Sequence, residues 1–266
     1  MLKHEWTFFS ESLAKELVSD QCADLIIANN VFAHVPDINN FVSGLKIMLA
    51  PEGRAILEFP YAVEMITQGE FDTVYHEHVY YFTLTSLKPL FARHEMCVTH
   101  VERTPLHGGS LRLFVQHASH KPEKTVAQLF AEEEQLEVGT FNFYRTFAPR
   151  AEAIRVCLQS RLDELKTKGQ RLGAYGAAAK GSVLLNFCDF TADDVEFVAD
   201  CSPHKQGKFM PGVNLPVVPA EELVKRAPDV TLLLAWNFAD EILAQQVEYQ
   251  RSGGKFLIPI PEVRLI

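Results

Sequence analysis

The pattern of apolar and polar residues predicts a parallel βαβ unit in the first part of the chain. Residues 24–28 (DLIIA) and 54–60 (RAILEFP) have the composition of short buried strands. Between them, Asp37 is a typical N-cap for a helix that runs to about Ala50, and Pro51-Glu52-Gly53 is expected to end it. A strand, a helix and a strand at this spacing favour a parallel sheet.

Further elements surround this unit. We expect a short helix at 9–20 (FSESLAKELVSD) before it and a helix near 84–93 after it. Two alternating strands follow at roughly 96–103 and 110–117, and LRLFVQH alternates more clearly than the other strand.

The second part of the chain repeats the α/β pattern after a helical stretch. The pattern is helical at about 121–169, and we interpret its acidic run 132-EEEQLE-137 as a solvated helix face rather than a partner-binding tail. A strand, a glycine turn and a helix begin at 171-RLGAYGAAAKGSVLLNF-187, and further strand and helix patterns alternate to the end. We therefore predict domains at 1–118 and 119–266.

Composition narrows the classes of function. The chain has 266 residues, 47% of them hydrophobic and 22% charged, with a net charge of −9, which argues against affinity for nucleic acid or an anionic membrane. It has neither a membrane-length apolar run nor a signal-peptide profile at its start. The five cysteines are scattered without a CxxC, so we expect free thiols and a cytoplasmic location.

One signal typical of nucleotide-binding domains is missing from the first half. Such a domain normally opens with a strand and a glycine-rich turn. Here the chain opens on a helix, and no GxGxxG or GxGxG occurs anywhere. The first half is therefore either not such a domain or one whose front is missing.

The stretch 71-FDTVYHEHVYYF-82 concentrates titratable groups at Tyr75-His76-Glu77-His78. In an extended segment, Tyr75 and Glu77 would lie on one side and the two histidines on the other. A zinc site needs a third or fourth ligand, and no HExxH or Cys/His pair supplies one, so we predict no metal. The alternatives are acid/base chemistry by histidine and polar residues satisfied in a loop.

A second candidate cluster follows the first predicted strand. His34 lies just past its carboxyl end, where open α/β sheets place their ligands, and Asn29 and Asn30 could bind a polar ligand there. The competing interpretation is a helix entry capped by Asp37.

Several turns of the second half have a similar placement. The stretch 173-GAYGAAAKGS-182 resembles a phosphate loop, but Lys180 precedes Gly181 in the wrong order, so either phosphate binding or close helix–strand packing explains it. Weaker signals lie at 107-HGGSLR-112, 204-HKQGKFMPG-212 and 235-AWNFADE-241. Together they make a nucleotide-sized pocket plausible.

Read in order, these segments resemble the sugar C-methyltransferases of deoxysugar biosynthesis, which use S-adenosylmethionine to methylate a carbon of a nucleotide-linked keto-deoxyhexose. The matching stretches run almost end to end: NNVFAHVPDINNFVSGLKIML, EFPY, FDTVYHEHVYYFTL, HGGSLR, GAYGAAAKG, PHKQGKFMPG and LAWNFADEI. The resemblance implies an α/β protein, with an incomplete class I methyltransferase (Rossmann-like) half followed by a second Rossmann-like domain that binds the nucleotide-sugar. Family members also carry a cysteine-rich zinc module and a glycine-rich cofactor loop at their front, which this sequence lacks.

The resemblance also implies roles for individual residues. His78 would be the base that forms an enolate, Tyr75 and Glu77 would orient it or the substrate, and His34 would stabilise the enolate. The cofactor pocket would be lined by Asn29, Asn30 and Val35. The substrate would contact His107, Gly109 and Ser110 at the domain junction, and Lys180, Gly181, Ser182, Lys205, Gln206 and Asn237 in the second domain.

Three other functions stay open from the sequence. Without the glycine loop, the chain could be a nucleotide-sugar-binding remnant without catalysis, or one half of a split enzyme whose front is supplied by a separate chain. A sugar epimerase that uses His78 as base would need no methyl donor.

Overall fold

A computed structural model describes residues 7–18 and 22–266, and these fold into two compact units. Unit 1 contains residues up to Met65 and His76–Tyr144, and unit 2 contains Ile66–Tyr75 and Arg145–Ile266. The predicted boundary near residue 118 falls directly after a strand of unit 1, and the helices at 124–144 also belong to unit 1. The chain therefore enters unit 2 briefly at 66–75 before it returns to unit 1.

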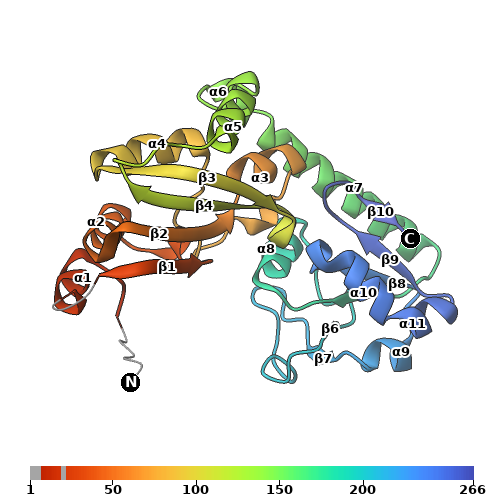
Figure 1. The fold of residues 1–266 in the computed structure, drawn as a ribbon. Coiled ribbons are helices and arrows are strands. Elements are labelled where there is room, and N and C mark those ends of the chain that lie inside the picture. The colour runs from red at the N-terminus through yellow and green to blue at the C-terminus, as the bar shows by residue number, and fades with distance from the viewer. Residues whose placement is uncertain (1–6, 19–21) are drawn as a thin grey trace. The chain divides into compact units, whose positions relative to one another are not determined.

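Unit 1 is built on a four-stranded sheet with the order β1-β2-β4-β3 (Figure 1). β1 is parallel to β2, whereas β4 is antiparallel to both β2 and β3. Its elements are α1 Glu11–Leu17, β1 Ala23–Asn29, η1 Phe32–His34, α2 Ile38–Met48, β2 Leu49–Pro60, α3 Ala62–Gln68 (whose last residues lie in unit 2), α4 Leu84–Arg93, β3 Met96–Thr104, η3 Leu106–Gly108, β4 Ser110–His117, α5 Lys124–Gln135 and α6 Phe141–Tyr144.

Most predicted elements of unit 1 are confirmed. The helix at 84–93 has the predicted bounds, and Asp37 is the N-cap of α2, with its carboxylate accepting from the backbone N–H of Asn40. The predicted helix end at Pro51-Glu52-Gly53 is wrong, because α2 stops at Met48 and these residues belong to β2. Gly53 lies so close to β1 that an added Cβ would be 2.7 Å from the Ala23 carbonyl oxygen. Positions 19 and 20 of the first predicted helix lie outside the described residues.

Unit 2 is a doubly wound sheet with the order β10-β9-β8-β5-β6-β7, parallel except for β10. In this order, neighbouring strands on the two sides of β5 are reached by opposite crossovers, which is the Rossmann arrangement. Its elements are η2 Phe71–Thr73, α7 Phe147–Thr167, β5 Leu172–Tyr175, α8 Ala179–Phe187, β6 Val198–Asp200, β7 Val217–Pro219, α9 Glu222–Arg226, β8 Val230–Leu233, η4 Trp236–Phe238, α10 Ala239–Gln245, α11 Val247–Arg251, β9 Lys255–Ile258 and β10 Arg264–Leu265. The predicted Rossmann-like α/β class is thus confirmed.

The acidic run of α5 is only partly a solvated face. Its other glutamates are exposed, but Glu133 is 1% exposed and binds the start of α4. Its carboxylate accepts hydrogen bonds from the N–H groups of Leu84 and Thr85, the Thr85 hydroxyl and the Tyr61 hydroxyl. Two otherwise unpaired donors of a helix N-terminus are thereby satisfied. Burial of Tyr61 beside this carboxylate raises the pKa of the phenol.

We predict that Glu133→Gln destabilises unit 1. Both oxygens of the carboxylate accept hydrogen bonds, and the substitution replaces one of them with an NH₂ group that cannot accept from those donors. The expected loss in the free energy of unfolding is about 1–3 kcal/mol. Urea denaturation, together with hydrogen exchange of the α4 amides, measures it. Glu134→Gln, one position along on the exposed face, is the matched control and should leave both readouts unchanged. Equal behaviour of the two variants would contradict the assigned role of Glu133.

Candidate active site

In unit 1, the chain leaves the carboxyl end of β1 in a tight turn that presents polar side chains. Asn29 ends the strand, and Asn30 adopts φ 53° while its N–H donates to the Glu58 carbonyl on β2 (2.8 Å). Both amide side chains are exposed. Asparagine tolerates this left-handed conformation better than most residues do, which accounts for its place in the turn.

Buried aromatic rings hold the next residues in place. Phe32 has no exposed surface and stacks on Phe82, with ring centroids 4.7 Å apart. Its ring also lies 5.8 Å from Phe59. These contacts fix the 3-10 turn η1, at whose end His34 stands half-buried. Val35, predicted to line the cofactor pocket, is buried directly after it.

The segment after the histidine motif is tied to η1 through the backbone. The N–H groups of Val79 and Tyr80 donate to the Ala33 carbonyl at 2.9 and 3.3 Å. This contact brings the His34 and His78 rings to a centroid distance of 5.0 Å in an edge-on arrangement. The Tyr81 ring, which sequence reasoning did not single out, is 6.1 Å from His78. Unit 1 therefore assembles two imidazoles and a phenol beside the end of β1.

The expected alternation of sides within Tyr75-His76-Glu77-His78 is wrong. The chain bends at Tyr75 and turns at His76 and Glu77, so the segment is not extended there. His76 and Glu77 are exposed, whereas Tyr75 and His78 are half-buried. His78 lies against another predicted catalytic residue, His34.

The turn between β3 and β4 adds a third histidine to unit 1. His107 adopts φ 58°, and its Nε2 lies 3.4 Å from the Asn30 side-chain nitrogen. Gly109 has φ 144°, and an added Cβ would be 2.7 Å from the Glu64 side chain, so only glycine fits. Ser110 is buried, and its hydroxyl donates to the Leu106 carbonyl. The predicted group at 107–110 thus reaches the Asn30 turn through His107.

In unit 2, close packing explains the glycines of 173-GAYGAAAKGS-182. Gly176 has φ 90°, and an added Cβ would be 2.6 Å from the Ala235 Cβ. Gly181 lets α8 pack on the end of β8, since a Cβ there would be 2.9 Å from that of Leu234. The predicted role of Gly181 as a substrate contact stays a prediction.

Lys180 and Asn237 contact one another between α8 and the end of β8. The Lys180 amine donates to Asn237 Oδ1 (3.0 Å) and lies 4.2 Å from the centre of the Trp236 ring. Burial lowers the pKa of Lys180, and the carboxylates of Asp72 and Glu70 oppose that shift. Asp72 is fully buried and accepts from the Trp236 indole N–H at 2.7 Å. Burial raises its pKa to about 6 despite the attraction of Lys180.

A cavity of about 240 Å³ opens beside the N-terminus of α8. Ser182 and Lys205, both predicted to contact substrate, line it together with His204, Lys208 and Phe209, which belong to the segment at 204–212. Three cationic or protonatable groups and an exposed aromatic ring next to a helix N-terminus suit a phosphorylated aromatic ligand.

Asp200 holds the backbone around this cavity by hydrogen bonds. One carboxylate oxygen accepts from the Ala177 N–H and the other from the Ser202 N–H, each at 2.7 Å. The Lys205 amine lies 3.5 Å away from the carboxylate, and the Gln206 amide donates to the Asp200 carbonyl. Gln206 thereby supports the turn on which Lys205 stands.

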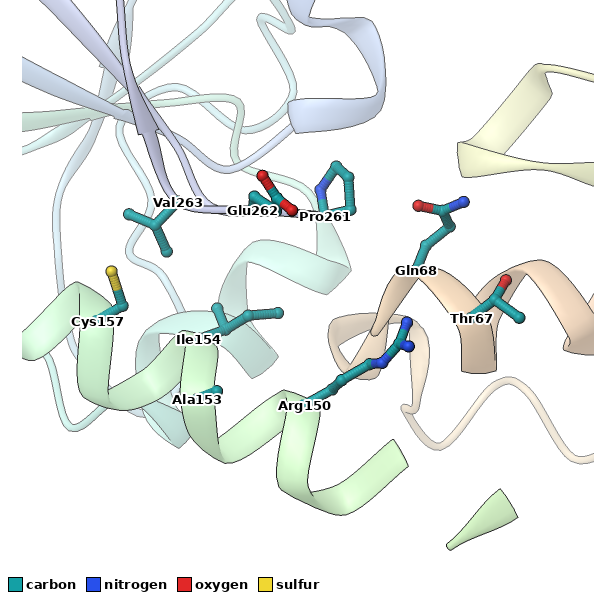
Figure 2. Close-up of a pocket in the computed structure, with 9 residues that line it drawn as sticks. All are labelled: Thr67, Gln68, Arg150, Ala153, Ile154, Cys157, Pro261, Glu262 and Val263. Atoms are coloured by element: carbon teal, nitrogen blue, oxygen red, sulfur yellow. The ribbon is translucent and has the colours of Figure 1, made fainter. Parts of the chain in front are cut away.

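A larger cavity of about 560 Å³ lies along α7, and sequence reasoning named none of its residues. Figure 2 shows its lining: Thr67, Gln68, Arg150, Ala153, Ile154, Cys157, Pro261, Glu262 and Val263. Ala153, Ile154, Pro261 and Val263 give the lining an apolar part, and Arg150 and Glu262 contribute opposite charges. No group of three or more metal-binding side chains occurs within residues 7–18 and 22–266. In the same part of the chain, no helix has the length and apolar character that crossing a membrane requires.

Comparison with known proteins agrees with this α/β architecture. Residues 3–101 match a family described as a methyltransferase domain. Residues 105–261, more than half of the chain, match the C-methyltransferase C-terminal domain. Both matches are to methyltransferase domain families. The chain belongs to the C-methyltransferase family.

A curated relative supports the same assignment. The chain is 37% identical over 261 residues to the C-methyltransferase NovU of Streptomyces niveus. The match covers 97% of this chain and 62% of NovU, so the chain spans less than two thirds of that relative's length.

We predict that Asp72→Asn changes how stability depends on pH. Because the pKa of Asp72 is raised in the folded protein, this carboxyl favours folding most at low pH, and its contribution falls as pH rises from about 4 through about 6. The free energy of unfolding of Asp72→Asn relative to the unsubstituted protein should therefore increase over that window, by on the order of 3 kcal/mol at most.

Urea denaturation at several pH values between 4 and 7 measures this difference. Asp193→Asn, at an exposed position of the same unit, is the control and should give a nearly flat difference. A flat difference for Asp72→Asn as well would show that its carboxyl titrates as an ordinary exposed one.

Proposed function

We propose that this protein catalyses S-adenosylmethionine-dependent C-methylation of a nucleotide-linked keto-deoxysugar. The observation that carries the proposal is the pair His34 and His78, whose rings lie 5.0 Å apart beside the end of β1. Transfer of a methyl group to a carbon next to a carbonyl requires a base and groups that stabilise the enolate, and imidazoles serve both needs near neutral pH.

In this proposal, His78 removes the proton from the carbon next to the keto group, and the electron pair moves onto the carbonyl oxygen. His34 donates a hydrogen bond to that oxygen. Tyr75 orients the sugar or the base. Glu77, which is exposed in the turn, has the same orienting role. The His107–Asn30 contact extends the polar surface on which the sugar hydroxyls bind.

The methyl donor is expected beside the same strand end. Asn29 and Asn30 offer exposed amides there, and buried Val35 supports the turn that carries them, so this part of unit 1 fits one side of the donor. When bound, S-adenosylmethionine supplies an electrophilic methyl group.

The nucleotide of the substrate is assigned to the cavity of unit 2. Lys205, Lys208 and His204 can offset the charge of a diphosphate, and the Phe209 ring, 65% exposed, can stack on a base. Ser182 adds a hydroxyl from the first turns of α8. The protein has a net charge of −9, so the cationic side chains that line this cavity are opposite in sign to the chain as a whole.

We predict that His78→Asn abolishes proton removal, which can be measured without the methyl donor. In D₂O, a base that removes the proton next to the keto group exchanges it for deuterium, and NMR of the nucleotide-linked keto-deoxysugar follows that exchange. Loss of the base should slow the exchange about 10²–10⁴-fold.

The neighbouring His76 provides the matched control, since it is exposed in the same motif. His76→Asn should retain the exchange rate. Equal rates for His78→Asn and the unsubstituted protein would remove His78 from the role of base. Exchange with no methylation on addition of the donor would favour an epimerase.

We predict that Lys205→Gln weakens binding of thymidine diphosphate about tenfold, because one charge-assisted contact to phosphate is lost. Isothermal calorimetry of the protein with the nucleotide measures the dissociation constant. Lys225→Gln, on α9 and outside the cavity lining, should leave it unchanged. If Lys205→Gln binds as tightly as the control, the diphosphate does not lie in this cavity.

A further inference from the structure

The strand order of unit 2 defines where an open sheet binds its ligand. From β5 the chain crosses to β6 and β7 on one side of the sheet, and from β7 it crosses back to β8 on the other side of β5. The strand order therefore reverses between β5 and β8, and the crevice lies beyond the carboxyl ends of these two strands. The side chains that follow these ends are Lys180 on α8 and Trp236 and Asn237 on η4. In most proteins of this topology, an anionic ligand would meet such groups.

Here the chain's own carboxylate, Asp72, binds Trp236 and interacts electrostatically with Lys180. Asp72 is 0% exposed, and its Oδ2 accepts from the Trp236 indole N–H at 2.7 Å. Its charge attracts Lys180, whose amine is held over the Trp236 ring and against Asn237. A buried carboxylate is unfavourable unless it is hydrogen-bonded and near a cation. Trp236 satisfies Oδ2 and the charge of Lys180 lies nearby, whereas the buried Oδ1 accepts no hydrogen bond from the described residues.

Apolar packing fixes the neighbouring residue as well. Phe71 is 6% exposed, belongs to the hydrophobic core of unit 2 and packs on Phe187 with ring centroids 4.6 Å apart. Thr73 closes the turn by donating from its hydroxyl to the Glu70 carbonyl at 2.7 Å. The 3-10 turn η2 is thus packed on the core of unit 2 through Phe71 and closed locally by Thr73.

This anchor stands directly before the histidine motif in the chain. Just past the motif, the Val79 N–H donates to the Ala33 carbonyl in unit 1, so residues 73–78 lie between these two backbone anchors. A chain extends by at most about 3.5 Å per residue, so both anchors restrict where His78 can move.

We propose that Asp72 is a positioning residue, whose carboxylate binds the Trp236 indole beside the Lys180–Asn237 pair and thereby fixes the start of the segment that carries His78. The proposal rests on the proposed function in taking His78 as the base. It assigns Lys180 and Asn237 to holding the chain rather than the substrate. A docked segment restricts the positions that His78 can adopt. Because small displacements of a base from its productive geometry slow the reaction, this restriction favours turnover.

The test compares Asp72→Ala and Asp72→Asn with Asp193→Asn as control, using hydrogen exchange read by mass spectrometry. In Asp72→Ala, amides of 73–79 should exchange roughly tenfold faster through local opening, while β5 and β8 stay protected. Asp72→Asn keeps an acceptor for Trp236 and should be intermediate. Unchanged exchange of 73–79 in Asp72→Ala, or equal acceleration throughout unit 2, would overturn the proposal.

A second variant covers the case in which Asp72→Ala does not fold. Trp236→Phe keeps the aromatic ring but removes the N–H donor to Asp72, and it should also accelerate exchange of 73–79. Protection of 73–79 equal to that of the unsubstituted protein would overturn the proposal.

Turnover then separates positioning from stability. With the folded fraction held equal, Asp72→Ala should lower kcat for deuterium exchange at the sugar carbon about tenfold or more with little change in KM, and Asp72→Asn should partly restore it. An unchanged kcat would overturn the proposal. If His78→Asn itself exchanges normally, the proposed function fails, while the amide-exchange result still decides whether Asp72 docks the segment.

Discussion

Two anchors on a short piece of chain constrain the candidate active site. At one end, Asp72 accepts the indole hydrogen bond of Trp236 inside unit 2, and at the other, Val79 donates to the Ala33 carbonyl inside unit 1. The residues between them include Tyr75, Glu77 and His78. Neither anchor is a contact of the motif side chains themselves.

The carboxyl ends of the strands explain where the remaining polar residues gather. In unit 1, Asn30 and His34 follow β1, and in unit 2 the cationic cavity lies beside the turn after β5 and β6. Buried residues support both places: the stacked rings of Phe32 and Phe82 hold the first, and Asp200 holds the second through two backbone N–H groups. The polar candidate residues of both units thus lie on turns that buried residues support.

Local patterns were sufficient to predict much of this fold. The cap at Asp37, the helix at 84–93 and the alternation of LRLFVQH concern neighbouring residues only, and the structure agrees with all three. The family resemblance implied that His34 and His78 serve one site, and their rings lie 5.0 Å apart. What failed depends on distant contacts. Glu133 looks like one more solvated glutamate until the start of α4 is packed against it, and the turn at Tyr75–Glu77 depends on tethers to other parts of the chain. The docking of 66–75 in unit 2 left no local signal beyond the apolar Phe71 next to Asp72.

We propose that His78 directs methylation to carbon. Incubation with S-adenosylmethionine carrying a ¹³C-labelled methyl group and a nucleotide-linked keto-deoxysugar, followed by carbon NMR, tests it most directly. The account predicts a labelled methyl on the carbon next to the keto group, formed by the protein and its His76→Asn variant but not by His78→Asn. A label on oxygen, or the same carbon-bound product from His78→Asn, would contradict the account.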